Sequence, residues 1–147
     1  MSQLTFCTSM LPIADKLHTL LSHHYTCQYL TNPDSATSSY LVFNFRDKSY
    51  SAQAGGFHPV EIAICQSAGG AWTIEYITDF AYAGNAYPEL ERCLDFDFRV
   101  RQFFTTYQGW LPMSQSDDAC ALYQLWESNF LSYIDMDAYD DVSVTPQ

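Results

Sequence analysis

The side chains best suited to chemistry belong to four residues, Arg46, Asp47, His58 and Asp79. A histidine beside a carboxylate is the minimum for general base catalysis, because the carboxylate fixes the tautomer and stabilises the charged imidazolium. An arginine could hold an anionic substrate through two parallel hydrogen bonds. A structural alternative stays open, in which His58 and Asp79 bind the loop backbone around residues 55–56 and Arg46 pairs with a carboxylate.

The strands that carry these four residues are expected to bring them together. Alternating apolar and polar residues predict three consecutive strands over 40–46, 60–65 and 71–80. When such strands run antiparallel, the end of the first, the start of the second and the end of the third lie at one edge of the sheet. Within the third strand, alternation places these residues on one face: Trp72, Ile74, Tyr76, Thr78 and Phe80.

Helices are expected towards both ends of the chain. The first is predicted to begin near Ser9, with Pro12 in its first turn, and the last to be capped by Ser116. The polar residues 31–35 predict a loop after the first helix. Between the third strand and the last helix we expect a short helical turn over 87–91 and a strand over 94–99. Residues 100–107 extend that strand or form a fifth, and residues 109–112 break the pattern.

This order predicts an α+β domain, with an N-terminal and a C-terminal helix packed on an antiparallel sheet of four to five strands. The glycine pairs and the many aromatic residues indicate a strongly curved sheet, such as a roll or an open cone. The chain of 147 residues is predicted to form a single domain over 1–147. Residues 1–9 are expected to be a loose arm or an edge strand, and residues 142–147 a flexible tail.

The charge is strongly acidic and unevenly distributed. Seventeen Asp and Glu against six Lys and Arg give a formal net charge of −11, and the residues after Arg101 contain no Lys or Arg. Such a surface repels nucleic-acid phosphates and anionic lipid, so we expect neither direct nucleic-acid binding nor membrane binding. The acidic C-terminal part is either a solvated helix face or a docking surface for a positively charged partner.

The cysteines indicate a reducing compartment. They form an odd set without a CxxC pair, and we interpret all five as reduced and structural: Cys7, Cys27, Cys65, Cys93 and Cys120. The N-terminal apolar residues follow no basic segment, and no run of 18 apolar residues occurs. The sequence therefore predicts a cytoplasmic protein without a signal peptide or a membrane-spanning helix.

The histidines of the first predicted helix do not have the spacing of a metal site. Zinc sites on a helix use two histidines four residues apart, whereas His18 lies five and six residues before His23 and His24. These three are expected to be exposed. Residues 135–146 begin like a calcium loop, but Asp140 replaces the required glycine and Pro146 the required glutamate. We expect no metal and no cofactor.

Asp95 and Asp97 share one face of the fourth predicted strand, roughly 7 Å apart. Two such carboxylates could flank a sugar or bind a cation, although simple alternation in an exposed strand also accounts for them. The sequence has no GxSxG, phosphate-loop, dinucleotide-binding or HExxH motif. Without such a motif, a non-enzymatic function is favoured.

The motifs NFRD, GGFHPVEI, YITDFAY and LDFDF, spread over about residues 43–98, resemble an uncharacterised family of short proteins from marine and enteric gammaproteobacteria. The resemblance implies a roll-like α+β fold, a gammaproteobacterial source and relatives carried on mobile elements. It implies no activity and transfers no functional residue.

Three functions are compatible with these observations. The first is a non-enzymatic cytoplasmic protein-interaction module, homodimeric or with a partner that has a basic surface. The second is a small-molecule binder or enzyme that uses Arg46, His58 and Asp79 at the mouth of the curved sheet. The third is an acidic mimic of DNA, which would need carboxylates spaced along one face like phosphates.

Overall fold

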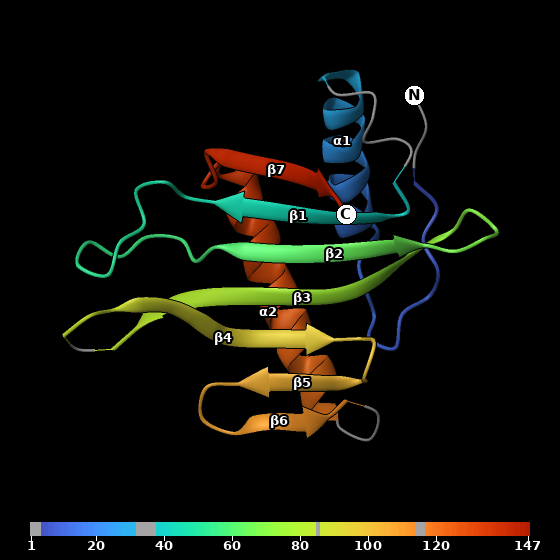
Figure 1. Ribbon diagram of the computed structural model, residues 1–147. Coiled ribbons are helices and arrows are strands. Elements are labelled where there is room, and N and C mark those ends of the chain that lie inside the picture. Colours follow the sequence, from blue (N-terminus) through green and yellow to red (C-terminus); the bar gives the residue numbers. More distant parts are fainter. Residues whose placement is uncertain (1–3, 32–37, 85, 114–116) are drawn as a thin grey trace.

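Alternating apolar residues build one open, curved antiparallel sheet behind which both helices lie (Figure 1). The computed structural model describes residues 4–31, 38–84, 86–113 and 117–147. Within these ranges the sheet has seven strands in the order β6-β5-β4-β3-β2-β1-β7. Their bounds are β1 Tyr40–Arg46, β2 Val60–Gln66, β3 Trp72–Ala83, β4 Glu89–Asp97, β5 Gln102–Thr105, β6 Gly109–Pro112 and β7 Asp141–Pro146.

The two helices, α1 (Asp15–Thr31) and α2 (Asp117–Asp135), cover the same face of the sheet, and α2 crosses the strands (Figure 1). The predicted α+β class with a curved sheet is confirmed, but the sheet has more strands than the four to five expected. Neither helix, as far as the chain is described, is long and apolar enough to span a membrane.

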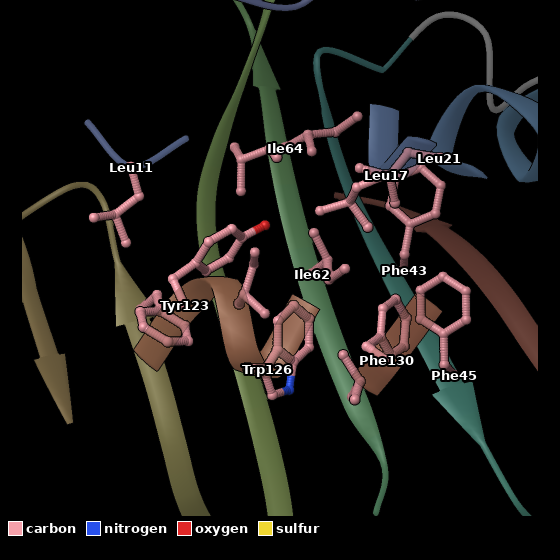
Figure 2. Packing of buried hydrophobic residues seen from close by; sticks show 14 of the residues in the cluster. Leu11, Leu17, Leu21, Phe43, Phe45, Ile62, Ile64, Tyr123, Trp126 and Phe130 are labelled. Carbon is pink, nitrogen blue, oxygen red and sulfur yellow. The ribbon is translucent and has the colours of Figure 1, made fainter. Parts of the chain in front are cut away.

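The core packs aromatic side chains of α2 together with leucines and isoleucines of α1 and the strands (Figure 2). Tyr123, Trp126 and Phe130 follow one another at helical spacing on α2, so all three point at the strands. The Phe130 ring meets Phe45 of β1 edge-on at 5.2 Å, and the Tyr123 ring meets Phe96 of β4 in the same way at 5.1 Å. Edge-to-face contacts of this kind add to the stabilisation that burial provides.

The predicted flexible tail over 142–147 is wrong, because residues 142–146 belong to strand β7 and the Gln147 amide donates to the Tyr40 carbonyl at 2.9 Å. β7 pairs with β1 along its whole length, and Val144, which is buried, lies opposite Phe43. The alternating Val142 and Val144 complete the apolar face that β1 would otherwise expose at the sheet edge.

The predicted loose arm is also wrong where it is described, over residues 4–9. Phe6 forms a parallel bridge with Trp72 at the start of β3. The amide of Cys7 donates to the Trp72 carbonyl at 2.8 Å, and the amide of Trp72 donates to the Thr5 carbonyl at 2.7 Å. These backbone hydrogen bonds hold the segment against the sheet.

Three other local predictions need correction. The first helix begins at Asp15, not near Ser9; the buried Glu127 side chain accepts a hydrogen bond from the amide of Ala14 at 2.9 Å, just before that start. Residues 87–91 are not helical, because β4 begins at Glu89 to pair with the long β3, and residues 109–112 form β6. The predicted Ser116 cap, and the predicted loop apart from Thr31, lie outside the described residues.

A β-bulge overturns the predicted faces of the third strand. Ala63 pairs with Tyr76 but Ile64 pairs with Ile74, so Glu75 is an extra residue in β3. The bulge shifts the alternation by one residue. Ile77 therefore joins Ile74 in the core, whereas Tyr76 faces away from the helices.

Replacing Val144 with aspartate tests the strand β7. Val144 is only 5% exposed, so the new carboxylate would be buried without a partner. We expect Val144→Asp to lower the free energy of unfolding by about 3 kcal/mol, measured by urea denaturation. Thr145→Asp, on the exposed side of the same strand, is the control and should change it by less than about 0.5 kcal/mol. Equal losses in the two variants would show that residues 142–147 do not pack as a strand.

Candidate functional site

An ion pair between His58 and Asp79 lies where β2 and β3 approach α2. Val60 pairs with Asp79, which places the loop residue His58, two positions upstream, beside that carboxylate. His58 Nδ1 lies 2.8 Å from Asp79 Oδ1, and the Trp126 indole Nε1 donates to Asp79 Oδ2 at 3.1 Å. One carboxylate thus joins the loop, the sheet and the helix.

The ion pair keeps His58 charged at neutral pH. The hydrogen bond to Asp79, with a further contribution from Cys93, raises the pKa of His58 from 6.5 to about 10. Burial opposes this shift but does not cancel it. The His58 side chain is 42% exposed and that of Asp79 15%. The imidazolium is therefore accessible at the surface while its counter-ion is largely sheltered.

Cys93 is the residue of this site that the sequence did not indicate. A second bulge, in which Asp79 pairs with Leu94 but Phe80 pairs with Arg92, makes Cys93 an extra residue in β4. Its Sγ, a ring nitrogen of His58 and a carboxylate oxygen of Asp79 lie within 4.8 Å of one another. Nothing in the local sequence marks Cys93, because the bulge arises from the pairing of β3 with β4.

A pocket of about 260 Å³ opens beside the ion pair, between the His58 loop and α2. His58 and Asp79 line it together with Gly56 and Asn129. The other lining residues are all aromatic: Phe57, Trp126, Phe130, Tyr133 and Tyr139. The Tyr139 hydroxyl donates to the backbone carbonyl of His58 at 3.3 Å, which holds the loop against the segment that follows α2.

Asp47 organises the loop but does not line the pocket. Its carboxylate accepts hydrogen bonds from the Ser49 hydroxyl at 2.6 Å, the Ser49 amide at 3.0 Å and the Phe57 amide at 3.1 Å. These bonds hold the pKa of Asp47 below its ordinary value. Gly56, at φ 137°, passes so close that a Cβ there would lie 2.8 Å from Asp47 Oδ2. Asp47 thus bonds to the loop backbone, the role that the structural alternative gave to His58 and Asp79.

Arg46 is exposed and belongs to a different depression, which it lines with Asp47, Tyr50 and Tyr82. The structure therefore brings His58 and Asp79 together, as expected from the strand order, but it does not place Arg46 in their pocket. Arg46 is the last residue of β1 and directly precedes Asp47.

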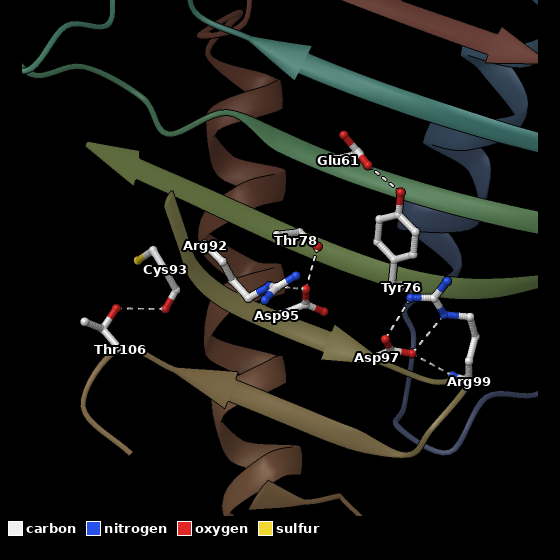
Figure 3. Close-up of polar contacts among 9 residues, drawn as sticks. All are labelled: Glu61, Tyr76, Thr78, Arg92, Cys93, Asp95, Asp97, Arg99 and Thr106. Carbon is white, nitrogen blue, oxygen red and sulfur yellow. Dashed lines mark hydrogen bonds and ion pairs between the residues drawn. The ribbon is translucent and has the colours of Figure 1, made fainter. Parts of the chain in front are cut away.

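Asp95 and Asp97 are not the exposed carboxylates expected from alternation. They lie on the sheet face away from the helices, where arginines cover them (Figure 3). Arg92 Nε donates to Asp95 at 2.9 Å, and Arg99 donates to Asp97 at 2.8 and 3.1 Å. Burial raises the pKa of Asp95, whereas for Asp97 the Arg99 hydrogen bonds outweigh burial and lower the pKa.

The same face carries a second polar contact, in which the Tyr76 hydroxyl donates to Glu61 and the Arg99 guanidinium lies 4.9 Å from the Tyr76 ring centroid (Figure 3). The uncovered face is thus held together by internal pairs. Arginines neutralise Asp95 and Asp97 on this face, whereas a mimic of DNA phosphates would have to present such carboxylates unpaired.

The expectation of exposed helix histidines is wrong for two of the three. His18 stacks on Phe6 with ring centroids 4.3 Å apart, and His24 meets Phe45 edge-on at 5.6 Å. Burial lowers the pKa of both. His23 is exposed, and its Nε2 lies 3.8 Å from Cys27 Sγ one turn further along α1.

The described residues form an α+β protein in which two helices pack on an open seven-stranded sheet. An aromatic pocket lies beside a His–Asp ion pair. The chain belongs to the family described as protein of unknown function (DUF2787), whose model matches residues 15–145. This confirms the resemblance to an uncharacterised bacterial family.

Two solved structures from Vibrio cholerae are similar along nearly the whole chain. A hypothetical protein from the VSP-II pathogenicity island is 64% identical with a TM-score of 0.91, over 98% of this chain and 99% of that one. A conserved hypothetical protein from pathogenicity island VPI-2 is 54% identical with a TM-score of 0.80, over 95% and 99%. The latter is described as sharing structural homology with the human P32 protein. None of the curated proteins matches the chain.

The ion pair predicts a pH-dependent stability. Because the pKa of His58 rises from 6.5 to about 10 on folding, its stabilisation is complete below about pH 6.5 and is lost as the pH rises to about 10. His58→Gln should therefore be less stable than the wild type at pH 6, with a difference that shrinks towards pH 10. Since the His58 side chain is 42% exposed, we expect about 1 kcal/mol. Urea denaturation across this range measures it, and a constant difference would contradict a charged His58.

Proposed function

We propose that the protein is a non-enzymatic interaction module that takes a cationic side chain, lysine or arginine, of a basic partner protein into the aromatic pocket. The observation that carries the proposal is the wall of five aromatic residues beside the His58–Asp79 pair. Ammonium and guanidinium groups bind the faces of such rings through the ring quadrupole, and more strongly when water is displaced.

The pocket is preorganised for this task. The Phe57 and Tyr133 rings pack at 4.9 Å and the Trp126 and Phe130 rings at 4.9 Å, so the walls support one another. The bond from Trp126 to Asp79 fixes the indole orientation. Binding of a ligand therefore costs little side-chain conformational entropy.

The net charge of the whole chain, and not the pocket itself, favours a cation over an anion. His58 and Asp79 neutralise each other as an ion pair, so the floor of the pocket carries little net charge. Two further carboxylates lie on the adjoining loops, where Asp47 accepts from the Phe57 amide and Asp140 from the Lys48 amide at 2.9 Å. With a formal charge of −11 on the whole chain, a basic partner is attracted and its association is steered.

The free cysteines support a cytoplasmic location for the proposed function. All five are free, which agrees with a reducing environment. A partner with a basic surface in that compartment meets the protein without crossing a membrane.

A peptide titration tests the proposed function. We expect a lysine- and arginine-rich peptide to bind the wild type, and an acidic peptide of equal length not to bind. Tyr133→Ser removes one pocket wall and should weaken binding about 5–30-fold. Tyr107→Ser removes a tyrosine that is 98% exposed and outside the pocket and should leave affinity unchanged. Isothermal titration calorimetry measures each affinity.

The alternatives give different results. Equal weakening by the two tyrosine variants would mean that the peptide binds through general charge and that the pocket is not the site. Tight binding of tetramethylammonium or an arginine amide, with no gain from a longer peptide, would make the pocket a site for small cations and contradict a protein partner.

A further inference from the structure

We infer that His58, Asp79 and Cys93 form a binding site for a divalent transition-metal ion, with zinc as the representative ion. The three residues come from the loop before β2, from β3 and from the β4 bulge. One donor atom from each lies within 4.8 Å of the other two. No other part of the described chain brings three such donors together in this way.

The donor set fits a borderline ion. Imidazole nitrogen, carboxylate oxygen and thiolate sulfur are the three protein ligands that zinc uses, whereas calcium and magnesium take oxygen. Sulfur in the set therefore selects against the hard cations. Three protein donors leave one tetrahedral position for water or for a group bound in the adjoining pocket.

The required rearrangement is small. Zinc holds N and O donors at ~2.0–2.1 Å and sulfur at ~2.3 Å, so neighbouring donors on one ion are about 3.3–3.6 Å apart. The hydrogen bond between His58 Nδ1 and Asp79 Oδ1 places a proton between atoms that are 2.8 Å apart. Replacing that proton by the ion opens the pair by about 0.5 Å, and the thiol, at most 4.8 Å away, closes by about 1 Å through side-chain rotation.

The surroundings already orient the ligands. Trp126 donates to Asp79 Oδ2 and leaves Oδ1 directed at His58, the kind of outer hydrogen bond that fixes a ligating carboxylate. A thiolate and a carboxylate together carry the charge that a divalent ion neutralises, and the net charge of −11 concentrates cations near the surface. Binding displaces the protons of the imidazolium and the thiol into solvent.

The chain contains a matched control on α1. His23 Nε2 and Cys27 Sγ lie 3.8 Å apart on an exposed face, so they offer the same two donor types without a third ligand from the sheet. Metal that binds any exposed Cys–His pair would occupy this position as readily. The inferred site is distinguished by its third donor, Asp79.

Cobalt substitution and alkylation test the inference, and neither needs the partner of the proposed function. We expect one equivalent of Co²⁺ to give a thiolate-to-cobalt absorption band and tetrahedral visible bands, both removed by one equivalent of Zn²⁺. Cys93→Ser should abolish the thiolate band, and Asp79→Asn should weaken Zn²⁺ binding at least tenfold. Cys27→Ser should leave the spectrum and affinity unchanged.

A footprint on the wild-type chain keeps the inference testable if a variant fails to fold. Zn²⁺ should slow iodoacetamide labelling of Cys93 at least tenfold, read by mass spectrometry, and leave Cys7 unaffected. Unchanged Cys93 labelling at saturating Zn²⁺, or loss of the cobalt band in Cys27→Ser, would overturn the site. Failed peptide binding alongside protected Cys93 would leave the metal site standing and reject only the interaction proposal.

Discussion

Helix α2 presses one aromatic stripe against the sheet, and both the core and the candidate site depend on that contact. Tyr123 and Phe130 are both almost fully buried and Trp126 nearly so, and Trp126 and Phe130 also lie along the pocket. The pocket therefore lies where the packing between α2 and the sheet is incomplete. Because Trp126 and Phe130 are core residues, this wall of the pocket has the rigidity of the core, whereas Gly56, Phe57 and His58 on the other side belong to a loop.

The two bulges, in β3 and β4, determine which polar side chains lie beside the pocket. The extra residue Glu75 turns the rest of β3 by one position, which places Asp79 near α2. The extra residue Cys93 then sets a thiol beside it. Bulges commonly re-aim side chains near functional sites, and here they collect a histidine, a carboxylate and a thiol from three separate segments. The same shift sends Tyr76 and Thr78 to the other face, where they bond to Glu61 and Asp95.

Charge is organised differently on the two faces of the sheet. On the uncovered face, Arg92 and Arg99 pair with Asp95 and Asp97, while Glu61 accepts a hydrogen bond from the Tyr76 hydroxyl. On the helix side, Asp79 is paired with His58, while Asp47 and Asp140 bind loop amides. Hydrogen bonds to amides satisfy a carboxylate but do not neutralise it. Asp47 and Asp140 therefore keep their negative charge on the loops beside the proposed site, where Arg46 and Lys48 also lie.

The sequence by itself determined the class of fold, because periods of two and near 3.6 residues follow from the geometry of strands and helices. It also predicted that His58 and Asp79 lie at one edge of the sheet, since consecutive antiparallel strands return to the same edge, although the same argument wrongly placed Arg46 in that group. Three features could be seen only in the tertiary structure. They are the pairing of β7 with β1, the burial of Asp95 under Arg92, and the bulge that places Cys93 beside His58 and Asp79. Strand partners and bulges depend on residues far apart in the chain, and their energies come from packing that no short segment contains.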